Sequence, residues 1–233
     1  MAGVHLEHVV REYIMGKTTI RAVDDISFTI PEGKYTIILG ASGAGKSTVL
    51  NILGGMDSPT SGLVRVNDKE ISKFNKRQLT DYRRESIGFV FQFYNLMPNL
   101  TVLENVELAS QICKNPLDAR EVLNMVGLGD RLNNFPAQCS GGEQQRGAIA
   151  RALAKNPDVL LCDEPTGALD YQTGKAILAL LYDLCRQSRK TVIVVTHNGA
   201  LAPTADILIR MKNGKIESFT ENPHPVPVQE LEW

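Results

Sequence analysis

The chain has 233 residues, and its 25 Lys and Arg against 26 Asp and Glu give a formal net charge of −1. This length allows a substantial buried core, and the balanced charge, with no long block of one sign, gives no support for non-specific nucleic-acid binding. The apolar runs are strand-length, far below the roughly 20 residues of a membrane span, and the first residues lack a signal-peptide pattern. The four cysteines lie far apart and are expected to be free thiols of a reducing compartment.

The first third of the chain is expected to consist mainly of strands. Apolar or β-branched runs predict strands at residues 4–13, 22–30, 35–39, 63–66 and 87–91. Residues 47–53 are typical of the first turns of a helix, and the charged stretch 73–85 predicts a surface helix. Strand, loop and helix therefore follow one another around residues 35–53.

The hydrophobic pattern changes between residues 93 and 155, where helical periodicity replaces strand patterns and predicts helices over 102–112 and 118–126. Strands resume at residues 159–163, 191–196, 206–211 and 215–219. A helix over 173–187 separates the first two, and this alternation is typical of an α/β fold with a mostly parallel sheet. Asn213 and Gly214 predict a hairpin between the last two strands.

Residues 222–233 form a tail with three prolines and no periodicity. Chain termini of this composition are commonly poorly ordered. Docking on the body or on a partner is the alternative, and we expect a disordered terminus.

The glycine-rich stretch at residues 40–47 fits the spacing G-x-x-x-x-G-K-[ST] of a phosphate-binding loop. Its glycines let successive backbone N–H groups and the helix N-terminus point at phosphates. Lys46 adds a positive charge, and the Ser47 hydroxyl suits a Mg²⁺ shell. The residues expected to bind ATP here are Gly40, Ser42, Gly43, Ala44, Gly45, Lys46, Ser47 and Thr48.

Two adjacent carboxylates, Asp163 and Glu164, lie at the carboxyl end of the apolar strand at residues 159–163. This is the end where α/β sheets place their ligands. Asp163 suits the water shell of Mg²⁺, and Glu164 is placed to polarise the water that attacks a γ-phosphate. The alternative is that these acids cap a following helix, which Pro165 and Thr166 make locally plausible.

A further motif, C-S-G-G-E-Q-Q-R at residues 139–146, opens a helix and resembles the signature motif of ABC-type ATPases. The resemblance extends to residues 40–47, Gln92, 163–170 and 196–197 in the same order, so it spans most of the chain. It implies a P-loop NTPase of ABC type over residues 1–221. This fold combines a mostly parallel core sheet, an antiparallel β subdomain and a helical subdomain inserted at about 93–155.

The resemblance also implies roles for single residues. In ABC ATPases two nucleotide domains pack head to tail, so ATP bound by one phosphate loop would contact Ser140, Gly141 and Gly142 of a second copy. Tyr13 resembles the aromatic that stacks on adenine, and the alternative is that it is simply the last residue of a surface strand. The remaining implied roles are Mg²⁺ and water sensing for Gln92, communication across the dimer for Asp170 and a γ-phosphate contact for His197.

Two signature positions depart from the usual residues. Cys139 replaces a leucine, and Glu143 replaces a glutamine. Because Ser140, Gly141 and Gly142 are intact, phosphate binding is expected to survive. The effect of the two changes on the rate of ATP hydrolysis and on its coupling to the permease stays open.

Within the class, residues 89–98, 105–108 and 163–170 look like the bacterial macrolide-exporter and lipoprotein-release ATPases. That subgroup implies a homodimer, peripheral on the cytoplasmic face of the plasma membrane beneath a separate permease with a large external domain, and no nucleic-acid partner. Phe93, Tyr94, Leu96 and Met97 would form a groove for a permease helix or would be core.

Two alternatives remain open at this point. One is a regulatory ABC ATPase whose permease transports nothing, and the other is a soluble ABC protein of translation or DNA repair. The second usually carries two nucleotide domains or a coiled-coil insertion, and this chain shows neither a heptad pattern nor a basic patch.

Overall fold

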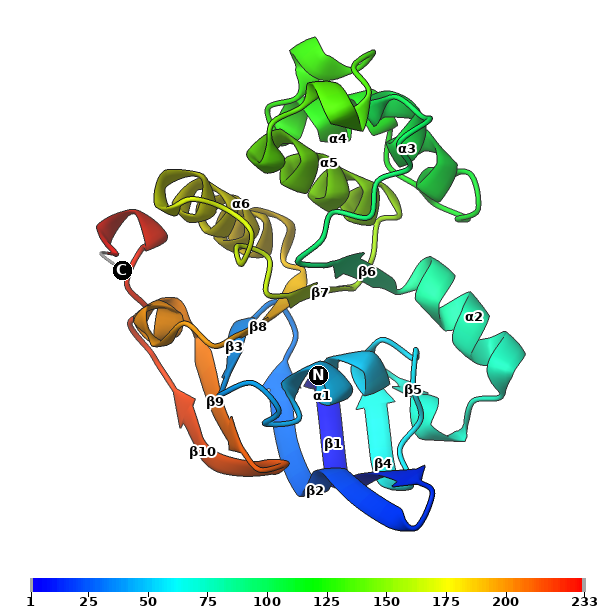
Figure 1. Ribbon diagram of the computed structural model, residues 1–233, viewed down its shortest axis with the longest axis vertical. Coiled ribbons are helices and arrows are strands. Elements are labelled where there is room, and N and C mark those ends of the chain that lie inside the picture. The colour runs from blue at the N-terminus through cyan, green and yellow to red at the C-terminus, as the bar shows by residue number, and fades with distance from the viewer. Residues whose placement is uncertain (1, 232–233) are drawn as a thin grey trace.

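Six strands form the larger of two sheets in the computed structural model, which describes residues 2–231 (Figure 1). In spatial order they are β10 (Lys215–Glu221), β9 (Ile207–Lys212), β3 (Tyr35–Leu39), β8 (Thr191–Thr196), β7 (Val159–Asp163) and β6 (Ile87–Val90). All neighbours are parallel except β9 and β10, which form the hairpin predicted from Asn213 and Gly214. Both turn residues have positive φ, as a tight hairpin of this kind requires.

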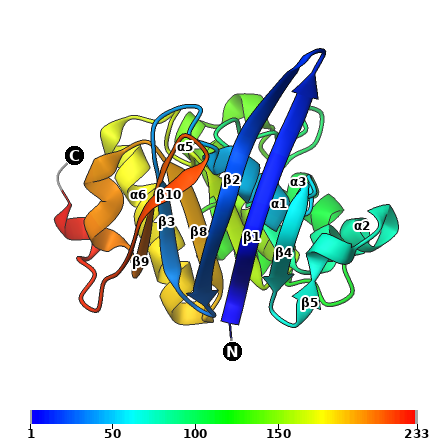
Figure 2. The same ribbon diagram turned by 90° about the horizontal axis from the view of Figure 1, so that it is seen from below.

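The smaller sheet is antiparallel and has the order β2-β1-β4-β5. Its strands are β1 (Ala2–Met15), β2 (Thr18–Pro31), β4 (Ser61–Val66) and β5 (Lys69–Glu70). Strands β1 and β2 extend beyond the expected ranges 4–13 and 22–30, and they project past the rest of the sheet as a long hairpin (Figure 2). The parallel core and the antiparallel sheet confirm the predicted fold class.

The α-helices are α1 (Lys46–Leu53), α2 (Lys76–Glu85), α3 (Val102–Ser110), α4 (Ala119–Met125), α5 (Gly141–Ala154) and α6 (Tyr171–Ser188). Short 3-10 helices lie at Ile71–Lys73, Gly129–Arg131, Pro136–Gln138, Gly199–Thr204 and Val228–Glu230. Helices α3, α4 and α5 form a group of their own beyond the edge of the large sheet (Figure 1), within the stretch expected to be helical. Within residues 2–231, no helix is both long enough and apolar enough to cross a membrane.

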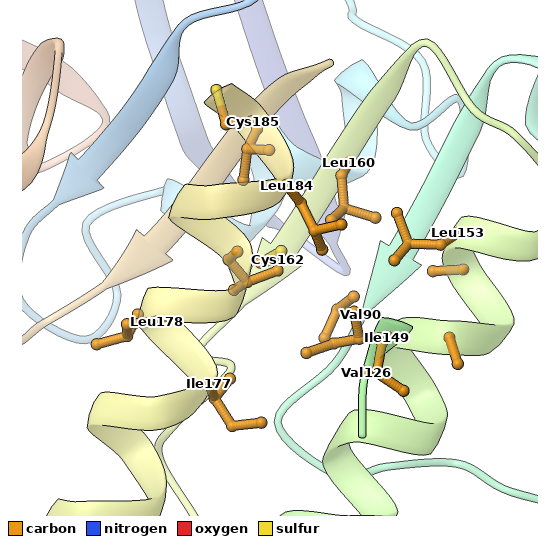
Figure 3. Close-up of a cluster of buried hydrophobic side chains, with 14 of the residues drawn as sticks. Val90, Val126, Ile149, Leu153, Leu160, Cys162, Ile177, Leu178, Leu184 and Cys185 are labelled. Carbon is orange, nitrogen blue, oxygen red and sulfur yellow. The ribbon is translucent and has the colours of Figure 1, made fainter. Parts of the chain in front are cut away.

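The large sheet is buried on both faces, which explains why its strands are apolar without interruption. On β8, Val192 and Val194 belong to one core cluster, whereas Ile193 and Val195 belong to the other. The first cluster joins β6 and β7 to α5 and α6, and Figure 3 labels its members Val90, Leu160, Cys162, Ile149, Leu153, Ile177 and Leu184. The second lies against α1 and the antiparallel sheet, so the loop between β3 and α1 is held between two packed layers.

The expectation of a disordered tail is wrong for residues 222–231. Val228 and Leu231 are buried in the core cluster of α6, and the ammonium of Lys175 on α6 donates to the Leu231 carbonyl at 2.7 Å. The polar, proline-rich sequence gave no sign that two apolar residues, Val228 and Leu231, pack against α6. Residues 232 and 233 lie outside the described part of the chain.

Replacing Val228 with Asp is expected to lower the Tm by about 4–8 °C, because a carboxylate at this buried position would lower the free energy of unfolding by about 2 kcal/mol. Thermal denaturation followed by circular dichroism measures the change. The matched control is Gln229→Asp at the exposed neighbouring position, which should leave the Tm unchanged. Equal Tm values for the two variants would show that the tail contributes nothing to stability.

Candidate nucleotide-binding site

The loop between β3 and α1 has glycines where no other residue fits. Gly45 has a φ of 97°, and a Cβ added there would lie 2.3 Å from the carbonyl oxygen of Ala22. A Cβ on Gly40 would lie 2.4 Å from the carbonyl oxygen of Met211. Strands β2 and β9 thus press against the two ends of the loop, and its curled backbone leaves N–H groups at the start of α1 as expected of a phosphate-binding loop.

Lys46 is the first residue of α1, and only 7% of its surface is exposed. Its ammonium donates hydrogen bonds to the carbonyl oxygens of Gly40 (2.8 Å) and Ala41 (3.0 Å). The positive charge therefore lies inside the curl of the loop, where an anion would meet it.

A cavity of about 890 Å³ opens in front of this loop. Its lining includes all of residues 41–48, Ala22, residues 91–93, Asp163, Glu164 and His197. The carboxyl end of β6 delivers residues 91–93 to it, that of β7 the two acids and that of β8 His197, as expected for ligand sites in parallel sheets. The structure thus brings the phosphate loop, Gln92, both acids and His197 together in one cavity.

Asp163 ends β7 opposite the start of α1, and the Ser47 hydroxyl donates to its Oδ1 at 3.2 Å. Burial raises the pKa of Asp163, and the hydrogen bond from Ser47 opposes this only in part. A partly desolvated carboxylate beside a hydroxyl is a donor set that suits a hard cation such as Mg²⁺.

Glu164 has a φ of 47°, which turns its side chain away from Asp163 and toward the end of β8. The Thr196 hydroxyl donates to Oε2 at 3.1 Å, and Nδ1 of His197 lies 2.8 Å from Oε1. Neither Glu164 nor Asp163 caps a helix, because α6 begins only at Tyr171 and Asp170 is its N-cap residue. That alternative for the two acids is wrong.

Gln145 is a contributor that sequence reasoning missed. It lies fully buried on α5 and donates to the carbonyl oxygens of Pro165 (2.7 Å) and Phe91 (3.3 Å). It therefore connects the helical group to the segments that carry Glu164 and Gln92. No local pattern marks this role, because the partners lie far away in the sequence.

The signature residues form the N-terminus of α5. Ser140 is the N-cap, and its backbone N–H donates to Glu143 at 2.8 Å while its hydroxyl accepts from the Glu143 backbone N–H at 3.3 Å. The hydrogen bond from the Ser140 backbone lowers the pKa of Glu143, and Arg131 pairs with the same carboxylate at 2.9 Å. Glu143 therefore completes a capping box, and its charge is paired.

Ser140, Gly141 and Gly142 do not line the cavity of the phosphate loop. A single copy therefore does not bring the signature motif and the phosphate loop together. Tyr13 is also absent from that lining; it lies on β1 opposite Ile20, two residues along β2 from Ala22, and its hydroxyl donates to Asp57.

The four residues after Gln92 that were expected to form a groove or core divide into two pairs. Leu96 and Tyr94 point toward α5. The Leu96 side chain lies 3.4 Å from a Cβ placed on Gly147, and the Tyr94 hydroxyl lies 2.7 Å from a Cβ placed on Gly141. Phe93 and Met97 are 71% and 51% exposed. Phe93 and Met97 are therefore the most exposed of the four, and Tyr94 and Leu96 are half-buried.

Asp163→Asn is expected to raise the Tm of the nucleotide-free chain at pH 7 by about 2–4 °C. A folded-state pKa above the unfolded value means that the ionised carboxylate costs stability at neutral pH, and the cost vanishes as the pH falls toward about 4. Asn removes that charge and can still accept the Ser47 hydrogen bond. The gain in Tm should therefore shrink as the pH is lowered, as thermal denaturation across this range would record.

The matched control is Asp170→Asn. Hydrogen bonding from Thr173 lowers the pKa of Asp170, so its charge favours the folded state and the substitution should not raise the Tm. A loss of stability on Asp163→Asn at pH 7 would contradict the assigned burial cost.

Comparisons with known proteins agree with this geometry. Residues 23–167 match the family model described as ABC transporter. The chain is 47% identical to an uncharacterized ABC transporter ATP-binding protein of Thermotoga maritima, covering 93% of this chain and 94% of that one. It is 44% identical to the macrolide export ATP-binding/permease protein MacB of Rhodopseudomonas palustris over 93% of this chain, but it spans only 34% of that protein.

Among solved structures, the dimeric post-hydrolysis state of the ATP-binding cassette MJ0796 of Methanocaldococcus jannaschii, bound to ADP and Pi, has a TM-score of 0.85. It is 43% identical in sequence, and the match covers 94% of this chain and 98% of that one. The likeness therefore extends over the whole fold, including both sheets and the helical group.

Proposed function

This chain belongs to the ABC transporter ATP-binding family and is an ABC-type ATPase, and on that premise we propose that it dimerises head to tail and drives a separate membrane permease. The observation that carries the proposal is the cavity in which the phosphate loop meets Gln92, Asp163, Glu164 and His197. Its lining would supply hydrogen-bond donors to the phosphates on one side and a general base, Glu164, on the other. The permease would be of the macrolide-efflux or lipoprotein-release type.

ATP would bind with its triphosphate along residues 40–48, where backbone N–H groups and Lys46 meet its negative charge. The oxygens of Ser47, Asp163 and the Gln92 side-chain amide would hold Mg²⁺, and their hard oxygen chemistry fits this ion. When bound, Mg²⁺ would neutralise part of the charge on the phosphates.

Glu164 would accept a proton from the attacking water, since one of its oxygens is held by Thr196 and the other lies against the imidazole of His197. The histidine side chain is largely exposed to the cavity, and so it would be free to contact the γ-phosphate. Gln92, whose side chain lies beside Gly167, would sense Mg²⁺ and the attacking water.

The dimer supplies what a single copy lacks. Ser140, Gly141 and Gly142 open α5 away from the cavity, so their N–H groups would reach ATP only across a head-to-tail interface. Asp170, the N-cap of α6, would transmit the state of one site to the other. The neighbour MJ0796, whose solved structure is a dimer, supports this arrangement.

The permease would contact the exposed apolar residues after Gln92, and the protein would thereby be held at the cytoplasmic face of the plasma membrane. MacB is named as a combined ATP-binding/permease protein, which supports a permease as the partner of this ATPase. Met97 is the residue best suited to a test, because it is 51% exposed and does not line the cavity.

The experiment is to immobilise the chain and apply solubilised membranes and, separately, ribosomes from the source cells. Capture of a polytopic membrane protein with a large external domain supports the proposal, and capture of ribosomes alone would refute it. Met97→Asp should abolish capture of the permease. Met125→Asp, at a similarly exposed methionine (54%) on α4, should not.

A further inference from the structure

An aspartate in the loop after α1 accepts four hydrogen bonds, three of them from side chains of β1. Oδ2 of Asp57 accepts from Arg11 Nε at 2.9 Å and from the Tyr13 hydroxyl at 2.7 Å. Oδ1 accepts from Arg11 Nη2 at 2.7 Å and from the backbone N–H of Ser58 at 2.8 Å. The guanidinium and carboxylate form a two-bond pair, which is the strongest geometry for such side chains.

The same arginine covers one face of the tyrosine ring. Arg11 and Tyr13 are two residues apart on β1, so their side chains lie on the same side of the strand. The guanidinium carbon of Arg11 lies 4.6 Å from the centroid of the Tyr13 ring, within the range of a cation–π contact. The side chains of Arg11 and Asp57 are only 24% and 20% exposed, so their pairing is partly shielded from water and salt.

This network also connects the ring to the helix that begins at the phosphate loop. The backbone N–H groups of Met56 and Asp57 both donate to the Asn51 carbonyl on α1, at 2.9 and 3.2 Å. Tyr13 pairs with Ile20 on β2, and Ala22 of the same strand lines the ATP cavity. Tyr13 therefore pairs with a residue only two positions along β2 from the cavity lining, and its hydroxyl is fixed relative to α1.

We propose that Asp57 and Arg11 are positioning residues that hold the Tyr13 ring ready to stack on the adenine of ATP. This rests on the proposed function, in which Tyr13 contacts that base. Asp57 holds the hydroxyl end of the ring in place, and Arg11 occupies one face, which directs the base to the other. A ring ordered in advance loses less conformational entropy when the base binds, so affinity for the adenine part of ATP rises while affinity for the triphosphate does not.

The test compares the Kd of Mg-ATP with that of Mg-tripolyphosphate, which has the phosphates without the base, by calorimetry. Tyr13→Ala is expected to lower the preference for ATP over tripolyphosphate about tenfold, through loss of stacking. Asp57→Asn and Arg11→Met should each lower it about three- to tenfold. Tyr13→Phe keeps the ring and loses only the hydrogen bond to Asp57, so it should act in the same direction with little risk to folding.

Two further variants separate positioning from general damage to the fold. Glu12→Gln breaks another arginine–carboxylate pair on the same hairpin, between Glu12 and Arg21, and should leave the preference at the wild-type value. In a Tyr13→Ala background, Asp57→Asn should cause no additional loss, because the ring that it positions is gone.

Wild-type preference in Asp57→Asn, Arg11→Met and Tyr13→Phe, with a reduced preference in Tyr13→Ala, would overturn the positioning role and leave stacking intact. An unchanged preference in Tyr13→Ala would overturn both stacking and positioning, although tripolyphosphate would still bind the phosphate loop. If the wild-type chain bound neither ligand, the proposed function itself would fail, and the positioning role with it.

Discussion

Replacing Glu164 with Gln is expected to reduce the rate of ATP hydrolysis by about 10²- to 10⁴-fold, which is the usual contribution of a general base. The amide can still accept the hydrogen bond that Thr196 donates to the native carboxylate, so the local structure should persist. It cannot take a proton from water, however. ATP binding should therefore remain, and the ATP-bound dimer should accumulate because hydrolysis no longer separates it.

Phosphate release measures the first effect, and size-exclusion chromatography with light scattering in the presence of Mg-ATP measures the second. The matched control is Glu104→Gln, which changes a capping-box carboxylate of α3 that does not line the cavity, and it should hydrolyse ATP at the normal rate. Normal steady-state hydrolysis by Glu164→Gln would refute its assignment as the base.

A mixture of two inactive variants is expected to regain ATP hydrolysis if each site is shared between two copies. Lys46→Met removes the charge of the phosphate loop, and Ser140→Asp keeps a good N-cap residue for α5 while placing a negative charge where the partner's phosphates would lie. Each variant alone should be at least about 10²-fold slower than wild type, because every site in its homodimer has one damaged half.

In a mixed dimer, the intact loop of the Ser140→Asp chain meets the intact signature of the Lys46→Met chain, so one site is whole. Phosphate release should therefore rise when the two chains are combined and should not rise when either is combined with itself. If each copy held a complete site, both halves of every mixed dimer would remain damaged. An inactive mixture, together with proof that mixed dimers form, would contradict the shared site.

The features that were predictable from sequence depend on residues close together in the chain. The phosphate loop is one continuous stretch, and the positive φ of Gly45 follows from its place at the start of the helix. The hairpin at Asn213 and Gly214 and the N-cap at Ser140 also depend on a few adjacent residues. Local backbone chemistry decides such structures, so a single sequence is enough to reveal them.

The features that sequence did not reveal join residues far apart. The two hydrogen-bond partners of Glu164 come from the end of β8, which lies beside β7 only because of the order of the parallel strands. Val228 seemed to belong to a free tail until α6 supplied the groove that buries it.

The division is clearest at the cavity in front of the phosphate loop. Sequence alone predicted a triphosphate site at residues 40–47 and acids at the end of a buried strand, because each motif is contiguous. The packing of the sheets and helices places Ser140, Gly141 and Gly142 outside that cavity and brings Asp57 to the Tyr13 hydroxyl. Contacts of this kind depend on how whole sheets and helices pack, and local sequence patterns do not encode them.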